Sequence, residues 1–158
     1  MTVARMQVVF LKRHGGQSQY SFHLQSQQTE GPLAPLLRWM VESPGEDLSV
    51  EALAERANMS VRNFYRSFER ATGQSPANWV EAMRVENAKR LLCQTDAQAE
   101  QIAYASGFGG YERMRRSFLR RLGISPLNYR KRFAPLTGGA GKDHDSGSPA
   151  YLDANEAA

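Results

Sequence analysis

The sequence predicts an all-α protein in which one helical unit occurs twice. Apolar residues recur three and four positions apart through seven segments bounded by capping residues, glycine or proline, and no internal segment is a convincing strand. In addition, RSFERATGQSP at residues 66–76 returns as RSFLRRLGISP at residues 116–126, with seven of the eleven positions identical. A duplicated supersecondary unit explains both observations.

The first unit is predicted from its capping residues. Its helices are expected over residues 32–43, 50–57 and 61–72. Ser49 and Ser60 stand where a hydroxyl caps the second and third of these helices, and Gly73 follows the third. The short helix, the tight turn and the longer helix together form a helix-turn-helix over about residues 49–73.

A long helix over residues 76–94 is expected to join this unit to its copy. Ser75 supplies the cap and Pro76 the first helical position, and at about 1.5 Å per residue the helix is roughly 28 Å long. In the copy, Thr95 with Gln98 fits a capping box. The expected helices of the copy cover residues 97–106, 110–122 and 126–133, so that the second helix-turn-helix spans about residues 96–123.

The two ends of the chain differ from this helical middle. Residues 1–31 contain one short apolar run, MQVVFL, and then a polar stretch, so we expect a largely irregular remnant of a preceding sensor domain and its linker. Residues 135–158 are rich in Gly, Ser, Ala and Asp and are expected to be disordered. The folded domain is therefore placed at residues 32–134.

Composition and charge narrow the function. The 158 residues are 41% hydrophobic and 23% charged, without an apolar run near the roughly 20 residues of a membrane-spanning helix, which favours a cytoplasmic protein. The single cysteine excludes an intrachain disulfide and a cysteine-rich zinc site, and no cofactor is expected. The net charge is +4, and residues 108–132 hold eight basic residues against Glu112 alone. Such a cluster indicates an anionic partner.

The second helix of each unit has side chains suited to DNA bases. In the first copy, Val61, Phe64, Phe68 and Ala71 form the expected buried stripe, and in the second copy Tyr111, Met114, Phe118 and Leu122 do so. The residues left to project are Arg62, Asn63, Tyr65 and Arg66 in the first copy and Glu112, Arg113, Arg115 and Arg116 in the second. Arginine pairs with guanine, asparagine with adenine, and glutamate accepts from cytosine.

The remaining predicted contacts go to the DNA backbone. The helix starts at Ser75 and Ser125 offer unpaired N–H groups to phosphates, and Arg130, Lys131 and Arg132 add positive charge. The joining helix would place the two recognition helices about one DNA turn apart, near 34 Å. One chain could then contact two successive major grooves of double-stranded DNA.

The string GFGGYERMRRSFLRRLGISPLNYRKRF, with the weaker copy ANMSVRNFYRSFERATGQSP before it, resembles the DNA-binding domain of AraC-type transcriptional regulators. The resemblance covers about residues 32–134. It implies seven helices, a sequence-specific regulator that activates through RNA polymerase, and Arg62, Tyr65 and Arg66 as base or backbone contacts. It also implies that Tyr111, Glu112, Arg115 and Arg116 are the counterparts in the second unit, although helical spacing puts Tyr111 on the packed side.

The segment ARMQVVFLKRHGGQSQYS resembles the junction in the subgroup whose sensor is a class I glutamine amidotransferase-like (PfpI-type) domain. This second resemblance implies that a small-molecule effector acts only through that sensor.

Two other classes of function stay open. An enzyme could use Cys93 as nucleophile with a histidine base, but His14 and His144 lie in the two ends, and a packed thiol explains Cys93 more simply. A protein-interaction module could use the basic face to bind an acidic partner. RNA binding is less favoured, since exposed aromatic residues are too few for a stacking platform.

Overall fold

The computed structural model describes residues 17–135, and these form eight helices and no strand. The helices are α2 (Gln17–Gln28), α3 (Ala34–Glu42), α4 (Val50–Arg56), α5 (Val61–Thr72), α6 (Pro76–Gln94), α7 (Ala99–Ala105), α8 (Tyr111–Leu122) and α9 (Pro126–Phe133). The all-α class is confirmed, whereas the predicted number of seven helices was one short. The expectations for residues 1–16 and 136–158 lie outside the described part of the chain.

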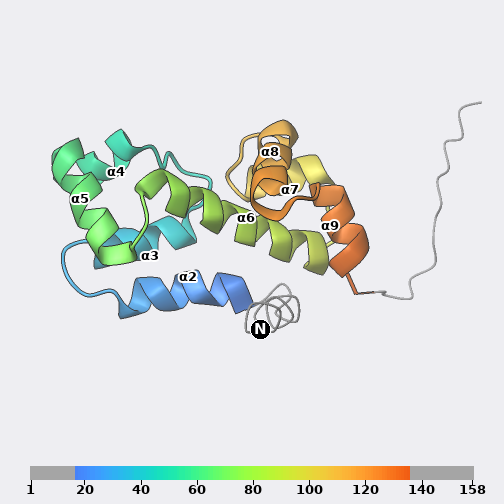
Figure 1. Cartoon of the computed structure of the whole chain (residues 1–158), viewed down its shortest axis with the longest axis horizontal. Helices are drawn as coiled ribbons and strands as arrows, with labels where there is room; N and C mark the ends of the chain where they lie inside the picture. The colour runs from blue at the N-terminus through green and yellow to red at the C-terminus, as the bar shows by residue number, and fades with distance from the viewer. Residues whose placement is uncertain (1–16, 136–158) are drawn as a thin grey trace, which may run out of the picture.

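The central helix α6 joins two groups of helices, α3–α5 at its N-terminal half and α7–α9 at its C-terminal half (Figure 1). Each group has its own apolar core. The first core gathers Leu37, Met40, Leu53, Phe64, Phe68 and Trp79, and the second gathers Leu92, Ile102, Met114, Phe118 and Tyr129. Fully buried aromatic rings hold α5 and α8 in these cores. Phe68 of α5 meets Trp79 of α6, and Phe118 of α8 meets Tyr129 of α9, so both helices have fixed positions.

The predicted serine caps are confirmed. The side chains of Ser49, Ser60, Ser75 and Ser125 each accept the backbone N–H three residues ahead, at 3.2–3.4 Å. The capping box at Thr95 and Gln98 was wrong. Instead, the side chain of Gln101 accepts the backbone N–H of Gln98, the residue that caps α7, while the Thr95 hydroxyl donates to Leu91 O at the end of α6.

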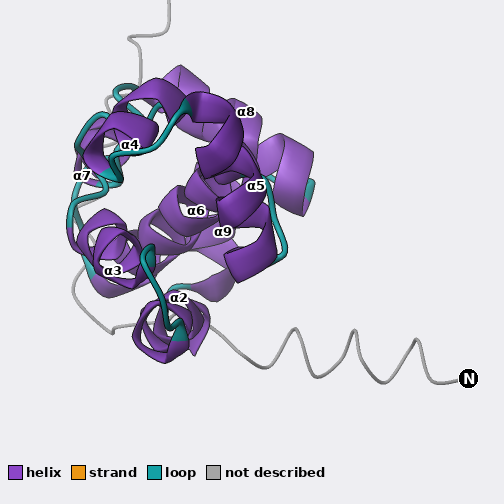
Figure 2. Cartoon of the chain, turned by 90° about the vertical axis from the view of Figure 1, so that its left-hand side faces the viewer, coloured by secondary structure: helices purple, strands orange, loops and turns teal. Residues whose placement is uncertain are grey.

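The helix that the sequence did not predict is α2, in a segment expected to be irregular. Its weak apolar pattern hid it, although glutamine is a good helix former. Tertiary contacts hold it on the first core: the Phe22 ring meets Trp79 edge-on at 5.1 Å, and Gln25 Oε1 accepts Trp79 Nε1–H at 3.0 Å. Both views place α2 across α6 from α8 (Figure 2).

Two predicted core residues lie at the surface. Val61 is 46% exposed and Leu122 is 37% exposed. They are the first residue of α5 and the last of α8, and the helix ends extend past the core that the middle turns contact. The other members of the two predicted stripes are buried or half-buried.

Candidate nucleic-acid interface

Helix α5 presents four of the predicted contact residues to solvent. Arg62, Asn63, Tyr65 and Arg66 are all exposed, and Tyr65 is 40% exposed. Within the described residues, no hydrogen bond or ion pair holds the guanidinium groups of Arg62 and Arg66. Since Phe64 on the opposite face is fully buried, α5 offers free donors on a fixed helix.

On helix α8, several of the predicted contact residues are hydrogen-bonded to one another. Glu112 accepts two hydrogen bonds from Arg115, at 2.7 and 2.9 Å, and one from Arg116 at 3.4 Å. The hydrogen bond from Arg115 is the main cause that lowers the pKa of Glu112 to about 2. Arg113 and Arg116 are exposed, whereas Arg115 and Tyr111 are half-buried, and Tyr111 packs against the second core.

Of the residues predicted to contact the DNA backbone, some lie at the surface or at helix starts and one is turned into the fold. Lys131 and Arg132 are exposed in the last turn of α9, and Ser75 and Ser125 cap the starts of α6 and α9. Arg130 instead turns inward. Its guanidinium donates to Leu92 O at 3.1 Å, Thr95 O at 3.3 Å and Ala97 O at 2.7 Å, so it closes the C-terminal end of α6.

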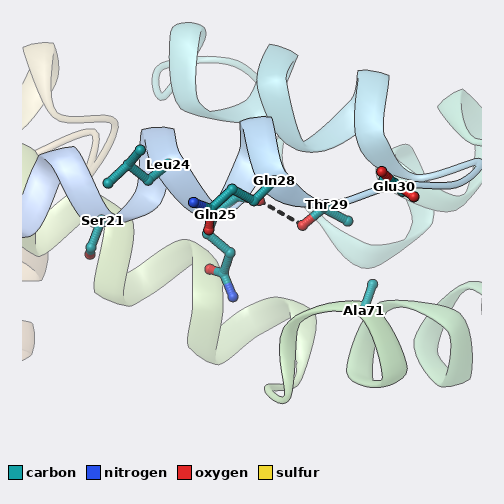
Figure 3. A pocket seen from close by; sticks show the side chains of 7 residues that line it. All are labelled: Ser21, Leu24, Gln25, Gln28, Thr29, Glu30 and Ala71. Atoms are coloured by element: carbon teal, nitrogen blue, oxygen red, sulfur yellow. Dashed lines mark hydrogen bonds between the residues drawn. The ribbon is translucent and has the colours of Figure 1, made fainter.

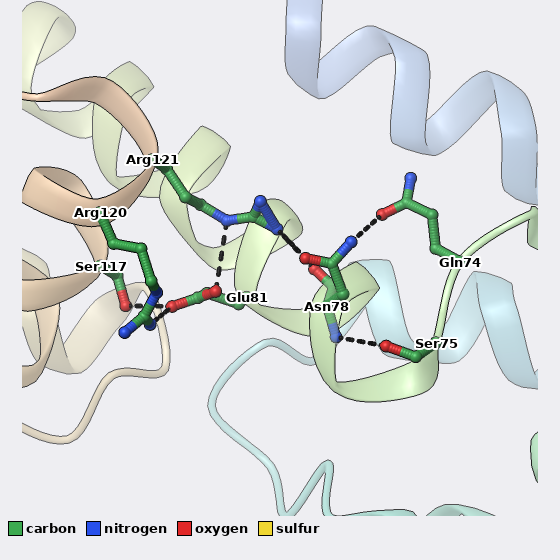
Figure 4. Close-up of polar contacts among 7 residues, drawn as sticks. All are labelled: Gln74, Ser75, Asn78, Glu81, Ser117, Arg120 and Arg121. Carbon is green, nitrogen blue, oxygen red and sulfur yellow. Dashed lines mark hydrogen bonds and ion pairs between the residues drawn. The ribbon is translucent and has the colours of Figure 1, made fainter.

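A cluster of charged and polar residues holds α8 against α6 (Figure 4). Ser117 Oγ donates to Glu81 Oε1 at 2.7 Å, and Arg120 donates to the same oxygen. Arg121 donates to both Asn78 O and Asn78 Oδ1 at 2.8 Å and forms an ion pair with Glu81 at 3.4 Å. We call Asn78, Glu81, Ser117, Arg120 and Arg121 the Glu81 cluster. Burial raises the pKa of Glu81, but the hydrogen bonds from Ser117 and Arg120 outweigh it, so the pKa is lowered overall.

A basic cleft of about 310 Å³ lies beside this cluster, between α6 and α8. Four arginines line it, Arg84, Arg113, Arg116 and Arg120, against the single carboxylate of Glu81. A larger hollow of about 660 Å³ lies between α2 and the end of α5 (Figure 3). It is lined by serine, threonine, glutamine, leucine and alanine with one carboxylate, Glu30.

The residues described contain no group of three or more side chains that could hold a metal ion. None of the described helices is long and apolar enough to cross a membrane. Burial is the main cause that raises the pKa of the Cys93 thiol, which is the opposite of what an activated nucleophile needs.

Similarity to known proteins identifies the family to which this fold and surface belong. A family profile described as a helix-turn-helix domain matches residues 53–132, from within α4 to within α9. The chain belongs to the AraC-type helix-turn-helix family. The HTH-type transcriptional regulator Rv1931c of Mycobacterium tuberculosis is 51% identical over 82 residues, which are 52% of this chain and 32% of that protein.

Two further proteins extend the comparison. The HTH-type transcriptional activator RhaS of Escherichia fergusonii is 28% identical over 130 residues, 82% of this chain and 47% of RhaS. The solved DNA-binding domain of AdpA, a global transcriptional factor in complex with a target DNA, is 39% identical with a TM-score of 0.63, and the match covers 66% of this chain and 94% of that one. This chain thus spans less than half the length of the two curated relatives.

Sequence reasoning missed the residues that join the units. No local sequence pattern marks Glu81, Asn78 and Arg84 as contact residues, since their hydrogen-bond partners lie 36 to 43 positions away. Arg120 and Arg121 were counted as basic charge without a role. An acidic residue on the joining helix, opposite a run of arginines at helical spacing, could have indicated the contact.

Proposed function

We propose that this chain is the DNA-binding part of a sequence-specific transcriptional regulator, with α5 and α8 in two successive major grooves of one duplex. One observation carries the proposal: α5 and α8 lie on the same side of α6 (Figure 2). Each of the two helices is held by buried aromatic side chains and carries exposed arginines. The solved relative in complex with a target DNA supports it. The duplicated sequence gives both helices equivalent surroundings.

The contacts proposed for α5 follow from side-chain chemistry. Arg62 and Arg66 have unpaired guanidinium groups that can bind guanine O6 and N7 in two-point fashion. Asn63 is suited to adenine. Tyr65 keeps its ring partly exposed and can donate to a phosphate or pack on a thymine methyl group.

The contacts proposed for α8 take account of its internal pairs. Arg113 and Arg116 are exposed and bind bases or phosphates. Glu112 uses three of about four acceptor positions on Arg115 and Arg116, which leaves one on Oε2 for a cytosine amino group. Arg115 then acts mainly by orienting Glu112. Tyr111, half-buried at the helix start, packs on the second core, and its exposed part is proposed to contact the DNA backbone.

Phosphate contacts are proposed at the ends of α6 and α9. The hydroxyls of Ser75 and Ser125 satisfy one N–H each, so other N–H groups of the first turns can bind phosphate oxygens. Lys131 adds a sequence-independent contact. Because α2 packs on the first core, we extend the proposed DNA-binding unit of residues 32–134 to include it.

The wider role is proposed from the relatives and from residues 4–21. Activation of transcription is the role that the name of the RhaS activator favours. That this activation acts through RNA polymerase, in the cytoplasm, is our proposal from the AraC-type resemblance. The resemblance of residues 4–21 to the junction with a PfpI-type sensor favours a small-molecule effector that acts through that sensor. The same subgroup resemblance makes amino acids and quaternary amines the candidate effectors. Because they would act on the sensor, we expect both to leave the DNA affinity of this chain unchanged, and a titration of both tests this directly.

The proposal is tested by selecting bound duplexes from a random pool and then measuring affinity across salt. We expect one enriched site with two conserved blocks about one helical turn apart, roughly 10 base pairs. Arg66→Ala and Arg116→Ala should each weaken binding by about 1–3 kcal/mol and relax base preference in different blocks. Loss of preference in the same block for both variants, or enrichment of no site, contradicts the proposal, and binding to an acidic protein alone would favour an interaction module.

A further inference from the structure

The two helical units share no core residue. The first core ends at Met83 on α6 and the second begins at Val85, so each unit is packed by itself within residues 17–135. The orientation of one recognition helix relative to the other is therefore set by α6 and by the polar contacts that cross from unit to unit.

The Glu81 cluster makes such a crossing. Ser117, Arg120 and Arg121 belong to α8 in the second unit, while Asn78 and Glu81 belong to the part of α6 that packs on the first core. The two groups of contacts lie one turn apart on α6, at positions 78 and 81, so they hold α8 along a line and not at a single point. This arrangement fixes the tilt of α8 on α6.

The same polar contacts continue to the end of the first recognition helix. Asn78 Nδ2 donates to Gln74 Oε1 at 2.9 Å, and the backbone N–H of Asn78 donates to Ser75 Oγ at 3.4 Å. Gln74 in turn bonds through its backbone to the Thr72 hydroxyl, which closes α5. Figure 4 shows this path from Arg121 through Asn78 to Gln74. The hydrogen bonds between Gln74 and Thr72 continue it to the last residue of α5.

A second contact limits motion of the other side of the second unit. Gly107, in the turn between α7 and α8, has φ +87°, and a Cβ placed there would lie 1.8 Å from Pro44 O in the loop between α3 and α4. Arg84 donates to the same oxygen at 3.2 Å. The backbone of the second helix-turn-helix thus lies directly against the first unit.

We propose that the Glu81 cluster determines which spacing between the two DNA blocks the protein accepts. It holds α5 and α8 at one offset, so only duplexes with a matching separation satisfy both helices. Glu81 is a positioning residue here, since it acts through the α8 arginines and contacts no base. The inference rests on the proposed binding of both helices to one duplex.

The geometry of DNA makes this a sharp requirement. Inserting one base pair moves the second block by about 3.4 Å along the duplex and by about 35° around it. A second unit held at two places cannot follow that rotation without breaking the crossing contacts. In Glu81→Gln the negative charge that pairs with Arg120 and Arg121 is lost, and the amide keeps one oxygen as acceptor where the carboxylate had two. The crossing is thereby weakened, so α8 can tilt to meet the displaced block.

The test measures affinity for a series of duplexes in which the selected site is shortened or lengthened by one and two base pairs. We compare wild type with Glu81→Gln and, as matched control, with Glu86→Gln. The control removes the same charge from α6, and within residues 17–135 Glu86 pairs only with Lys89 on that helix. The readout is the ratio of affinities between spacings, from which uniform changes in affinity or stability cancel.

We expect wild type and Glu86→Gln to lose about tenfold or more per base pair of altered spacing, the cost of one good base contact, and Glu81→Gln to lose about threefold or less. A Glu81→Gln profile as steep as that of the control overturns the inference and leaves the proposed function intact. A wild-type protein that prefers no spacing overturns both.

A measurement without DNA separates orientation from binding. Spin labels at Glu69 on α5 and Leu119 on α8, in a Cys93→Ser background, report the distance between the helices, since both sites are exposed. We expect a narrow distance distribution in wild type and in Glu86→Gln, and a broader one in Glu81→Gln. Equal widths in all three proteins contradict the inference.

Discussion

Arg130 and Lys131 are adjacent in α9, but we expect Arg130 to stabilise the fold and Lys131 to contact DNA. Its guanidinium closes the C-terminal end of α6 with three hydrogen bonds to main-chain oxygens, at 2.7, 3.1 and 3.3 Å. A hydrogen bond from a charged group contributes about 1.5–3 kcal/mol, and these carbonyls can partly rehydrate, so we expect Arg130→Ala to cost about 2 kcal/mol in total. For a domain of about this size, the melting temperature should fall by about 8 °C.

The assay compares Arg130→Ala with Lys131→Ala by thermal unfolding and by the salt dependence of DNA binding. Lys131→Ala should keep the melting temperature, because its side chain is exposed, and should lower the slope of log affinity against log salt by about one unit. Arg130→Ala should do the reverse. An Arg130→Ala protein that melts as wild type does and loses one unit of salt slope refutes the assignment of Arg130 to the fold.

Three further predictions concern single residues. The pKa of Glu112, about 2, is below its value in the unfolded chain, so the pairing with Arg115 is complete above the unfolded pKa and is lost as the pH falls toward 2. In Arg115→Gln, NMR of the Glu112 carboxyl carbon should show titration closer to pH 4.5. Gln25→Ala removes the acceptor for Trp79 Nε1–H and should red-shift tryptophan fluorescence and cost about 1–2 kcal/mol by urea unfolding. Gly107→Ala forces a Cβ onto Pro44 O and should cost at least about 2 kcal/mol by the same measurement.

The sequence determined the features that depend on neighbouring residues. Ser60, Ser75 and Ser125 were predicted as caps because the capping hydrogen bond spans only three positions. The exposed arginines of α5 and α8 were found because a helix repeats every 3.6 residues, which separates the buried ring of Phe64 from Arg62 and Arg66.

Long-range contacts were beyond the sequence. Helix α2 is held by Trp79, which lies 54 positions from Gln25, and no local pattern marks that partner. The same holds for Arg130, which the sequence placed among the basic surface residues. Its guanidinium donates hydrogen bonds to backbone carbonyl oxygens more than 30 positions away. Val61 and Leu122 failed because helical spacing shows which side of a helix is apolar, while the extent of the core decides how many turns it covers.

Chemical protection of guanine N7 on the selected duplex, at one chain per duplex, tests the central account most directly. Two recognition helices on one chain predict two protected major-groove blocks about 10 base pairs apart on the same face of the duplex. Protection of a single block, or a second block that appears only when a second chain binds, would contradict the account.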